Sequence, residues 1–466
     1  MADRNDNQLN SNSQSRPVGG TEFSWCRAVP GGTGISVLAL LLSKHIDIQI
    51  LQNALNKLQI SHPILRSKLT YTDPITFTIP SSPHIQIQFH DLTFTSNLIQ
   101  SNPFSESQSL SPFHRVLEHE LSQNDNWPNP FDSVQTDSDT FYCNLYAIEE
   151  TKWVLTFRLH TSVCDRTTAV VLLKEYLDII RKEEGVAGEL GSGDELNLGI
   201  EELIPNGKAN KPFWARGVDL LGYSLNSFRF ANVEFKDVES TRTSGVVRVR
   251  FNSDQTDRIL AGCKARGIKL CGSLAAAAIM AAYSSKDLPD HQWEKYAVVT
   301  LVDCRKELDP PLQSHNFGFY HSAILNTHDI AGETELWELS NRCYTACKNA
   351  INSNKHFSDM NDLNYLMCKA IDNPGLTTSS SLRTSFIAVF EDPVFEDSRD
   401  LQQEIGLEDY VGCSSVHGVG PSIAVFDTIR NGELDCSCVY PKPLHSREQM
   451  QELIDDMKRI LVNGSA

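Results

Sequence analysis

The chain has 466 residues, which is more than one hydrophobic core usually accommodates, so its length favours two domains of about 200 residues each. Hydrophobic residues make up 40% of the sequence and charged residues 21%, which is ordinary for a globular protein. The net charge of −18 argues against nucleic acid or an anionic membrane as the main partner.

The twelve cysteines show no spacing typical of a metal site. They are scattered singly, apart from Cys343 with Cys347 and Cys436 with Cys438, and neither pair lies near a second Cys or His pair at ligand spacing. Because no signal peptide is recognisable, we expect reduced thiols in a cytoplasmic protein without a bound metal. No apolar run reaches the roughly 18 residues of a membrane span.

Composition along the chain suggests where its domains begin and end. Residues 1–15 are polar and are predicted to form a disordered tail. An N-terminal domain is expected at 16–184 and a C-terminal domain at 241–466. Between them, 185–240 is assigned to a crossover linker because its first part is rich in Gly, Glu, Asp and Asn and lacks sustained periodicity.

The first half of the chain alternates between helical and strand patterns. Gly31, Gly32 and Gly34 precede a strand instead of following one, so they indicate a turn and not a phosphate-binding loop. The remaining elements expected before residue 150 are helices at 47–60 and 111–122 and strands at 75–79, 85–89 and 141–148.

The stretch 153–176 is the best candidate for a catalytic site. Residues 153–159 read as a strand, and a helical pattern begins at Thr167. The polar corner between them places His160 and Asp165 within six residues of each other.

The second half also alternates. Strands are expected at 246–251, 296–302, 384–390, 422–428 and 433–440, and helices at 253–266, from Ser273, at 336–350 and from Ser446. Asn431-Gly432 indicates a tight hairpin, and Ser446 with Gln449 indicates a capping box. Because both halves alternate, the expected fold class is α/β, with two domains sharing a cleft.

Five short segments occur in an order that resembles the chloramphenicol-acetyltransferase-like superfamily. They are SHPILR at 61–66, LHTSVCDRTT at 159–168, VDCR at 302–305, NFGFY at 316–320 and VHGVGPS at 416–422. This superfamily includes BAHD acyltransferases, alcohol acetyltransferases and condensation domains. The resemblance implies two mixed-sheet domains with a tunnel between them, which admits an acyl thioester from one face and an acceptor from the other.

The resemblance also implies roles for the corner residues. In an HxxxD motif the histidine deprotonates the acceptor and the aspartate pairs with a downstream arginine, so His160, Asp165 and Arg305 are the matching positions. His160 and Asp165 are separated by four residues instead of three. Without a gap, Thr161 takes the catalytic position and His160 points away; a one-residue bulge would keep His160 as the base. Arg166 stands where the family has glycine.

Other residues offer alternatives. His417 and His321 could supply an imidazole to the tunnel from the C-terminal domain. Gly418 and Gly420 match the glycines of the late BAHD motif, whose Asp, Phe and Trp are absent, and this favours the alcohol-acetyltransferase or condensation-like branch. The two glycines are also consistent with a simple turn before a strand.

The predicted function is acyl-CoA-dependent transfer of an acyl group to the hydroxyl or amine of a small metabolite, in a plant-like specialised metabolism. Acyl-CoA would be a co-substrate, with no resident cofactor or metal and with a monomeric protein. Two other functions remain open. One is a repurposed reaction such as elimination or cyclisation, and the other is a non-catalytic binding protein.

Overall fold

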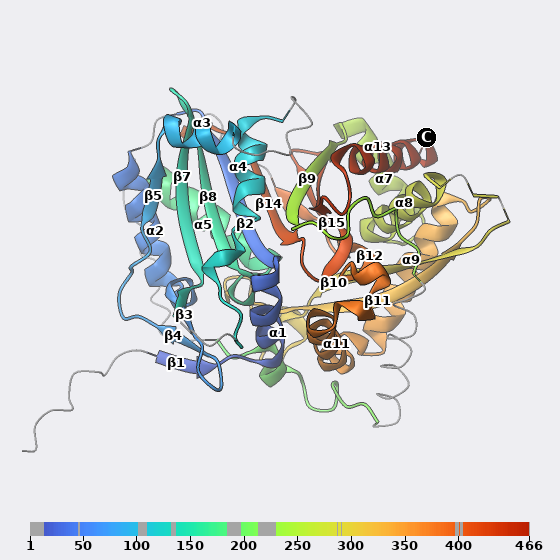
Figure 1. Ribbon diagram of the computed structural model, residues 1–466, viewed down its shortest axis with the longest axis horizontal. Coiled ribbons are helices and arrows are strands. Elements are labelled where there is room, and N and C mark those ends of the chain that lie inside the picture. The colour runs from blue at the N-terminus through green and yellow to red at the C-terminus, as the bar shows by residue number, and fades with distance from the viewer. Residues whose placement is uncertain are drawn as a thin grey trace, which may run out of the picture.

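The computed structural model has mixed sheets and helices in two halves that lie side by side, as Figure 1 shows. The expected α/β class is confirmed. The structure describes residues 14–44, 47–100, 110–131, 137–183, 197–212, 230–286, 288–289, 291–396, 400 and 404–465.

The N-terminal half is built on a five-stranded sheet with the order β14-β2-β8-β7-β5, in which β14 is Leu407–Val416. Successive side chains of a strand face opposite sides, so the two faces of β8 meet different helices. Phe157 packs edge-on against Tyr176 of α5, whereas Arg158 forms an ion pair with Glu120 of α4. The elements of this half are β2 (Thr33–Leu42), β5 (Ile87–His90), β7 (Phe141–Glu149), β8 (Lys152–His160), α2 (Ile48–Ser61), α3 (Leu92–Gln100), α4 (Pro112–Glu120) and α5 (Arg166–Glu183).

A smaller four-stranded sheet lies at the lower end of this half in Figure 1. Its strands, in sheet order, are β1 (Gln14–Pro17), β4 (Thr76–Ile79), β3 (Lys68–Thr70) and β6 (Ser138–Asp139). The predicted disordered tail therefore ends too late, because Gln14 and Ser15 pair with Ile79 and Thr78. Residues 1–13 of that tail lie outside the described residues.

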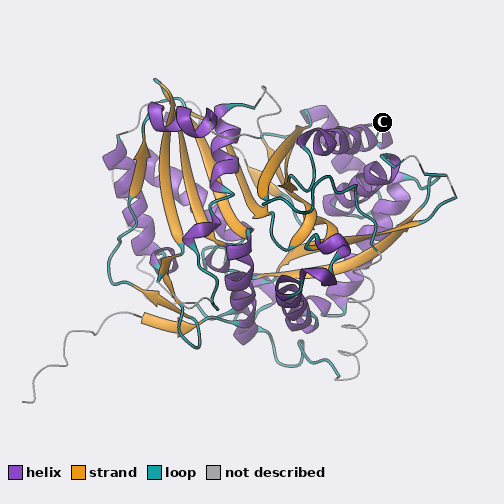
Figure 2. Ribbon diagram, viewed as in Figure 1, coloured by secondary structure: helices purple, strands orange, loops and turns teal. Residues whose placement is uncertain are grey.

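The C-terminal half is built on a seven-stranded sheet in the order β11-β10-β12-β15-β16-β9, with β13 also paired to β15. Figure 1 and Figure 2 show α7, α8, α9 and α13 on the outer side of this half, whereas α11 lies beside α1 (Gly20–Ala28), toward the other half. Nearly every residue of α8 is buried, which explains why its sequence is apolar all round. The elements are β9 (Thr243–Arg250), β10 (Glu294–Asp303), β11 (His321–Ile330), β12 (Arg383–Phe390), β13 (Val394–Glu396), β15 (Gly420–Arg430), β16 (Glu433–Lys442), α7 (Ser253–Ala265), α8 (Leu270–Ser284), α9 (Leu336–Asn352), α10 (Lys355–Ser358), α11 (Met360–Asp372) and α13 (Arg447–Gly464).

One strand crosses from the second half of the chain into the first sheet. β14 (Leu407–Val416) pairs antiparallel with β2 along most of its length. If the chain is divided at 185–240, β14 belongs by sequence to the C-terminal half, although it pairs with the sheet of the N-terminal half. Within that predicted linker, 185–196 and 213–229 lie outside the described residues.

The structure corrects some predicted boundaries and adds elements. The helix cap predicted at Ser253 is Asn252, and Ser273 is a buried residue inside α8 and does not begin it. The hairpin at Asn431-Gly432 is confirmed, since both residues have positive φ. The helix α1 (Gly20–Ala28), like α11 and β14, was not predicted. Among the described helices, no single helix is long and apolar enough to span a membrane. The pair α7 and α8 meets both criteria only when the two are taken together, and they are bent by 107° relative to each other.

Candidate functional site

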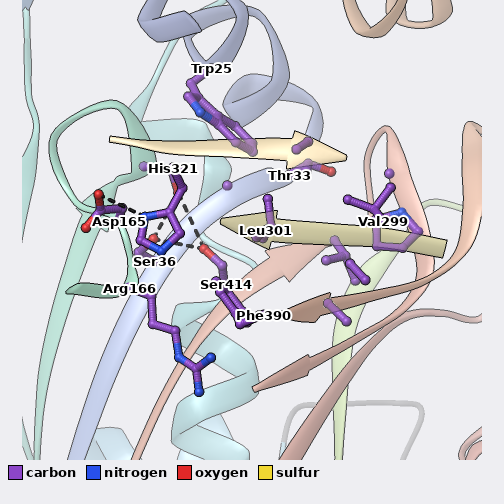
Figure 3. A pocket seen from close by; sticks show the side chains of 18 of the residues that line it. Trp25, Thr33, Ser36, Asp165, Arg166, Val299, Leu301, His321, Phe390 and Ser414 are labelled. Atoms are coloured by element: carbon purple, nitrogen blue, oxygen red, sulfur yellow. Dashed lines mark hydrogen bonds and ion pairs between the residues drawn. The ribbon is translucent and has the colours of Figure 1, made fainter. Parts of the chain in front are cut away.

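A cavity of about 380 Å³ lies between the two larger sheets. Strands β2 and β14 contribute one wall and β10, β11, β12 and β15 the other, while α1, α5 and α11 supply further residues. Most lining side chains are apolar. Figure 3 shows Trp25, Val299, Leu301 and Phe390 around this space. The described residues form the expected cavity between the halves, and a continuous tunnel stays a prediction.

The corner after β8 turns the chain into the helix α5. The strand ends at His160, a single 3-10 turn spans Thr161–Val163, and α5 begins at Arg166. Because adjacent residues at a strand end face opposite sides, His160 and Thr161 point in different directions. Thr161 lines the cavity, and His160 does not.

The His160 ring is enclosed in the N-terminal half. Its Nδ1 accepts a hydrogen bond from the Ser162 amide at 3.2 Å and lies 2.6 Å from the Ser162 hydroxyl. The imidazole also makes a T-shaped contact with Trp127, with 5.5 Å between ring centroids. Burial lowers the pKa of His160 to about 3. This position does not fit the role of base predicted for His160 and matches the ungapped alternative, in which Thr161 faces the cavity.

Three hydroxyl groups meet at the place where Thr161 enters the cavity. The Ser36 hydroxyl is 2.9 Å from that of Thr161 and 2.8 Å from that of Ser414, and Thr161 and Ser414 are 3.4 Å apart. Thr161 is the first residue of the turn after β8, Ser36 is on β2 and Ser414 is on β14, and all three residues line the cavity. Ser36 and Ser414 were not singled out by the sequence, although Ser36 interrupts the apolar run of β2.

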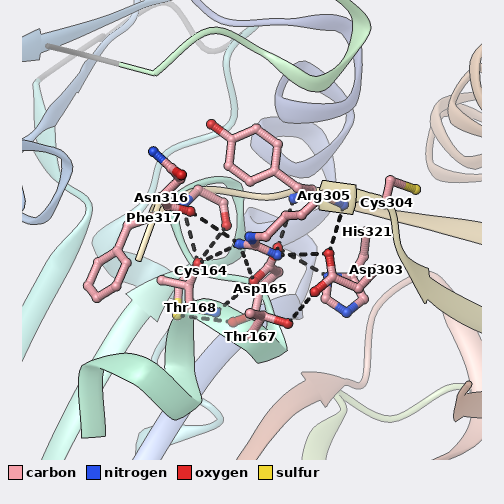
Figure 4. Close-up of polar contacts among 12 residues, drawn as sticks. Cys164, Asp165, Thr167, Thr168, Asp303, Cys304, Arg305, Asn316, Phe317 and His321 are labelled. Atoms are coloured by element: carbon pink, nitrogen blue, oxygen red, sulfur yellow. Dashed lines mark hydrogen bonds and ion pairs between the residues drawn. The ribbon is translucent and has the colours of Figure 1, made fainter. Parts of the chain in front are cut away.

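Asp165 is the best-connected residue of the corner. Its carboxylate accepts a hydrogen bond from the Thr168 amide at 2.8 Å, which caps α5, and another from the Tyr320 amide at 2.8 Å. Arg305 contacts both carboxylate oxygens, at 3.0 and 2.8 Å, so the ion pair predicted between these residues is present. Figure 4 shows this cluster.

The charges of the cluster stabilise one another. Burial alone would raise the pKa of Asp165, but Arg305 and then His321 outweigh it and hold the pKa well below its usual range. Burial likewise opposes the charge of Arg305, and Asp165 outweighs it and raises the arginine pKa. Asp165 is therefore an ionised carboxylate in a sealed position, as the structural role predicted for it requires.

His321, the first residue of β11, lines the cavity next to Asp165. Its Nδ1 lies 3.1 Å from Oδ2 of Asp165, a contact drawn in Figure 3. The two atoms lie within ion-pair distance, although Nδ1 has no well-aligned hydrogen-bond acceptor among the described residues. The ring also lies near Phe319 and Phe390. Of the two alternative histidines, His321 is thus the one that reaches the cavity.

His417 lies outside the cavity lining. Its Nδ1 is 2.9 Å from the Ser244 hydroxyl, and burial followed by the charge of Arg383 lowers its pKa to about 3. The neighbouring glycines are explained by close approach: a Cβ on Gly418 would lie 2.4 Å from the Gly31 carbonyl oxygen. Gly420 has φ +153 at the start of β15. These features support the turn interpretation of the late motif.

Arg166 spans the two halves of the protein. One of its guanidinium nitrogens lies 2.9 Å from Oδ1 of Asp427 on β15, and the guanidinium carbon lies 4.2 Å from the centroid of the Phe390 ring. A glycine at this position would make neither contact. No group of three or more His, Cys, Asp or Glu residues suited to a metal ion occurs in the described part of the chain.

One family profile matches part of the sequence. Residues 240–360 match the family profile described as the phthiocerol/phthiodiolone dimycocerosyl transferase C-terminus. No curated protein matches the sequence. The profile covers about a quarter of the chain, so this match alone does not assign the chain to that family.

Solved structures match almost the whole chain. Polyketide synthase associated protein 5 from Mycobacterium tuberculosis is 14% identical, with a TM-score of 0.66 over 97% of this chain and 98% of that one. The trichothecene 15-O-acetyltransferase TRI3 from Fusarium sporotrichioides is 12% identical, with a TM-score of 0.68 over 97% and 96%. The EpoB cyclization-docking bidomain from Sorangium cellulosum is 13% identical, with a TM-score of 0.66 over 97% and 85%. The protein therefore has the chloramphenicol-acetyltransferase-like fold of acyltransferases and condensation enzymes.

Proposed function

We propose that this protein transfers an acyl group from a thioester to the hydroxyl or amine of a small apolar molecule bound in the cavity. The observation that carries the proposal is a cavity between the two sheets of an acyltransferase-like fold, with an imidazole and a cluster of hydroxyls in its wall. A transferase fold alone would not suffice, because one fold hosts many functions.

The lining supports an apolar acceptor. Aromatic and aliphatic side chains make up most of the lining, and polar side chains, among them the hydroxyl cluster, His321, Asn364 and Glu396, are interspersed with them. Such a site binds an apolar body and orients one polar group. The proposed donor is an acyl-CoA, used as a co-substrate without a resident cofactor, and the proposed setting is the specialised metabolism of a plant-like cell.

The proposed reaction needs no covalent enzyme intermediate. The acceptor oxygen or nitrogen attacks the thioester carbonyl carbon and loses its proton to a base. The tetrahedral intermediate then collapses, the carbon–sulfur bond breaks, and the CoA thiolate leaves and takes the proton back. Holding the donor and acceptor together, and removing the proton, would supply most of the rate enhancement.

A second candidate is a cyclisation or another reaction without intermolecular acyl transfer. Two observations favour it: Thr161 faces the cavity where the resemblance expects a histidine, and a cyclization domain is among the proteins that share this fold. A threonine hydroxyl does not accept a proton near neutral pH.

The experiment that separates the candidates uses the purified full chain with acetyl-, malonyl-, benzoyl- and palmitoyl-CoA. Each donor is offered with a panel of aliphatic and aromatic alcohols and amines, and esters, amides and free CoA are measured by liquid chromatography and mass spectrometry. We expect acceptor-dependent CoA release. A Leu301→Trp variant, which narrows the cavity, should reduce it strongly, whereas Lys295→Trp at the half-exposed end of the same strand should not. Release of CoA that never depends on an acceptor would contradict acyl transfer to a second molecule.

A further inference from the structure

The corner after β8 leaves the cavity without the histidine expected there, so any base must come from elsewhere. Six histidines in the described residues are buried, and all but one lie outside the cavity lining; they are His160, His321, His328, His356, His417 and His445. The exception is His321.

The two nitrogens of His321 have different surroundings. Nδ1 faces the Asp165 carboxylate at 3.1 Å. Nε2 forms no hydrogen bond with the described residues. Nδ1 is fully buried, but Nε2 is not, and because His321 lines the cavity, Nε2 is accessible from it. A proton on Nδ1 would be stabilised by the carboxylate, and the lone pair of Nε2 would then point toward a bound molecule.

Asp165 is fixed firmly enough to orient that ring. Its two oxygens are already held by Arg305 and by the amides of Thr168 and Tyr320, and the carboxylate is buried. Tyr320 directly precedes His321, so the same carboxylate holds both the backbone and the side chain of this segment. Asp165 thus contacts two consecutive residues, Tyr320 through its backbone and His321 through its side chain.

Two carboxylates lie close to the segment that carries His321. Asp303 faces His321 in the register of β10 with β11, and Arg305 lies 3.1 Å from Asp303 as well as against Asp165. Arg305 therefore contacts both of the carboxylates that lie near His321.

We propose that His321 is the catalytic base of the cavity, oriented by Asp165, and that it takes over the role of the missing corner histidine. This inference rests on the proposed function for the identity of the proton. Nε2 removes the proton of the acceptor hydroxyl or amine as the new bond to the carbonyl carbon forms. The imidazolium then gives that proton to the thiolate released when the carbon–sulfur bond breaks, which returns the ring to its neutral state.

The kinetic test compares two matched variants, His321→Asn and His160→Asn. In the first, the introduced side-chain amide can keep a donor toward Asp165 but has no counterpart of Nε2. In the second, the introduced side-chain amide can keep an acceptor for the Ser162 backbone N–H. With the acyl-CoA and acceptor that the native protein uses, we expect kcat/KM to fall about 100-fold or more in the first variant and by less than about threefold in the second. Equal rates in the native protein and His321→Asn would overturn the proposal.

A second measurement does not depend on turnover. Nitrogen-15 spectra of histidine-labelled protein report which ring nitrogen carries the proton, and the signal lost in His321→Asn assigns the residue. We expect the Nδ1–H tautomer at His321 in the neutral ring, and a proton on Nε2 would overturn the inference. If no acyl-CoA is consumed by the native protein, the proposed function fails, and the tautomer still decides whether His321 presents a basic nitrogen to the cavity.

Discussion

The imidazole of His417 occupies the space in which a side chain at Gly32 would begin. A Cβ placed on Gly32 would lie 1.9 Å from Nε2 of His417, and the His417 amide donates a hydrogen bond to the Gly32 carbonyl at 3.1 Å. Gly32 also has φ +98, which side chains rarely adopt. This contact ties the start of β2 to the end of β14, the strand that joins the two halves of the chain.

Gly32→Ala should therefore destabilise the protein strongly. Both the left-handed backbone and the displaced His417 ring contribute, and together they should cost at least about 2 kcal/mol of unfolding free energy. The matched control is Gly31→Ala, because a Cβ on Gly31 would meet no atom within 4 Å. Urea unfolding of both variants checks the prediction, and equal stability of the two would refute the contact.

Removing one member of the Asp165–Arg305 pair should be costly. Arg305→Met leaves a buried carboxylate without its main opposing charge, for which we expect a loss of about 3–5 kcal/mol. Arg459→Met, which breaks the exposed pair with Asp456, should change the stability by less than about 1 kcal/mol. The double variant Arg305→Met with Asp165→Asn should be more stable than Arg305→Met alone, because the unpaired carboxylate charge is then removed. If Asp165→Asn instead lowered the unfolding free energy by as much in the Arg305→Met background as in the native protein, the two residues would act independently.

The sequence predicts the fold class well because strands and helices leave strong local patterns in it. Apolar runs and helical periodicity locate most strands and helices, and the hairpin at Asn431-Gly432 follows from turn chemistry. β14 escapes prediction because its segment contains Asp409, which looks like a loop residue. In the structure Asp409 is paired with Arg248 and Arg430, and such distant partners leave no local signal.

The site is predicted only in part for a similar reason. The Asp165–Arg305 pair follows from the order of the motifs. Which of His160 and Thr161 faces the cavity depends on a shift of one residue, and a strand places neighbours on opposite sides. The link from His321 to Asp165 joins two segments far apart in the chain, and neither segment contains a signal for the other.

Acid should destabilise the protein below pH 6.5 through its buried histidines. Burial lowers the pKa of His160, His417 and His445 to about 3 in the folded state, while the unfolded value is about 6.5. Between these values the unfolded chain binds protons that the folded chain does not, so the unfolding free energy falls as the pH falls. Each histidine should contribute about 1.4 kcal/mol per pH unit well inside this window.

The His160→Asn variant isolates one of these contributions. Its unfolding free energy, measured with urea from pH 6 to pH 4.5, should fall less steeply with acid than that of the native protein, by about one proton. Asp165 does not interfere, because a carboxylate whose pKa is lowered on folding loses its contribution only below about pH 4. An unaltered slope in His160→Asn would mean that this ring is protonated in the folded state.

Thr161 lies in the cavity wall, and its hydroxyl is expected to orient a bound molecule and not to exchange protons with it. Thr161→Val keeps the shape of the side chain and removes one of three hydroxyls that lie within 3.4 Å of each other. With Ser36 and Ser414 still paired at 2.8 Å, the polar side of the cavity would persist, so we expect turnover to fall by less than about tenfold, in keeping with one lost hydrogen bond. The control is Thr156→Val, the same change at a buried position of β8 outside the cavity lining, which should leave KM unchanged. A loss of 100-fold or more in Thr161→Val, with normal stability, would move the essential proton transfer to the threonine and away from His321.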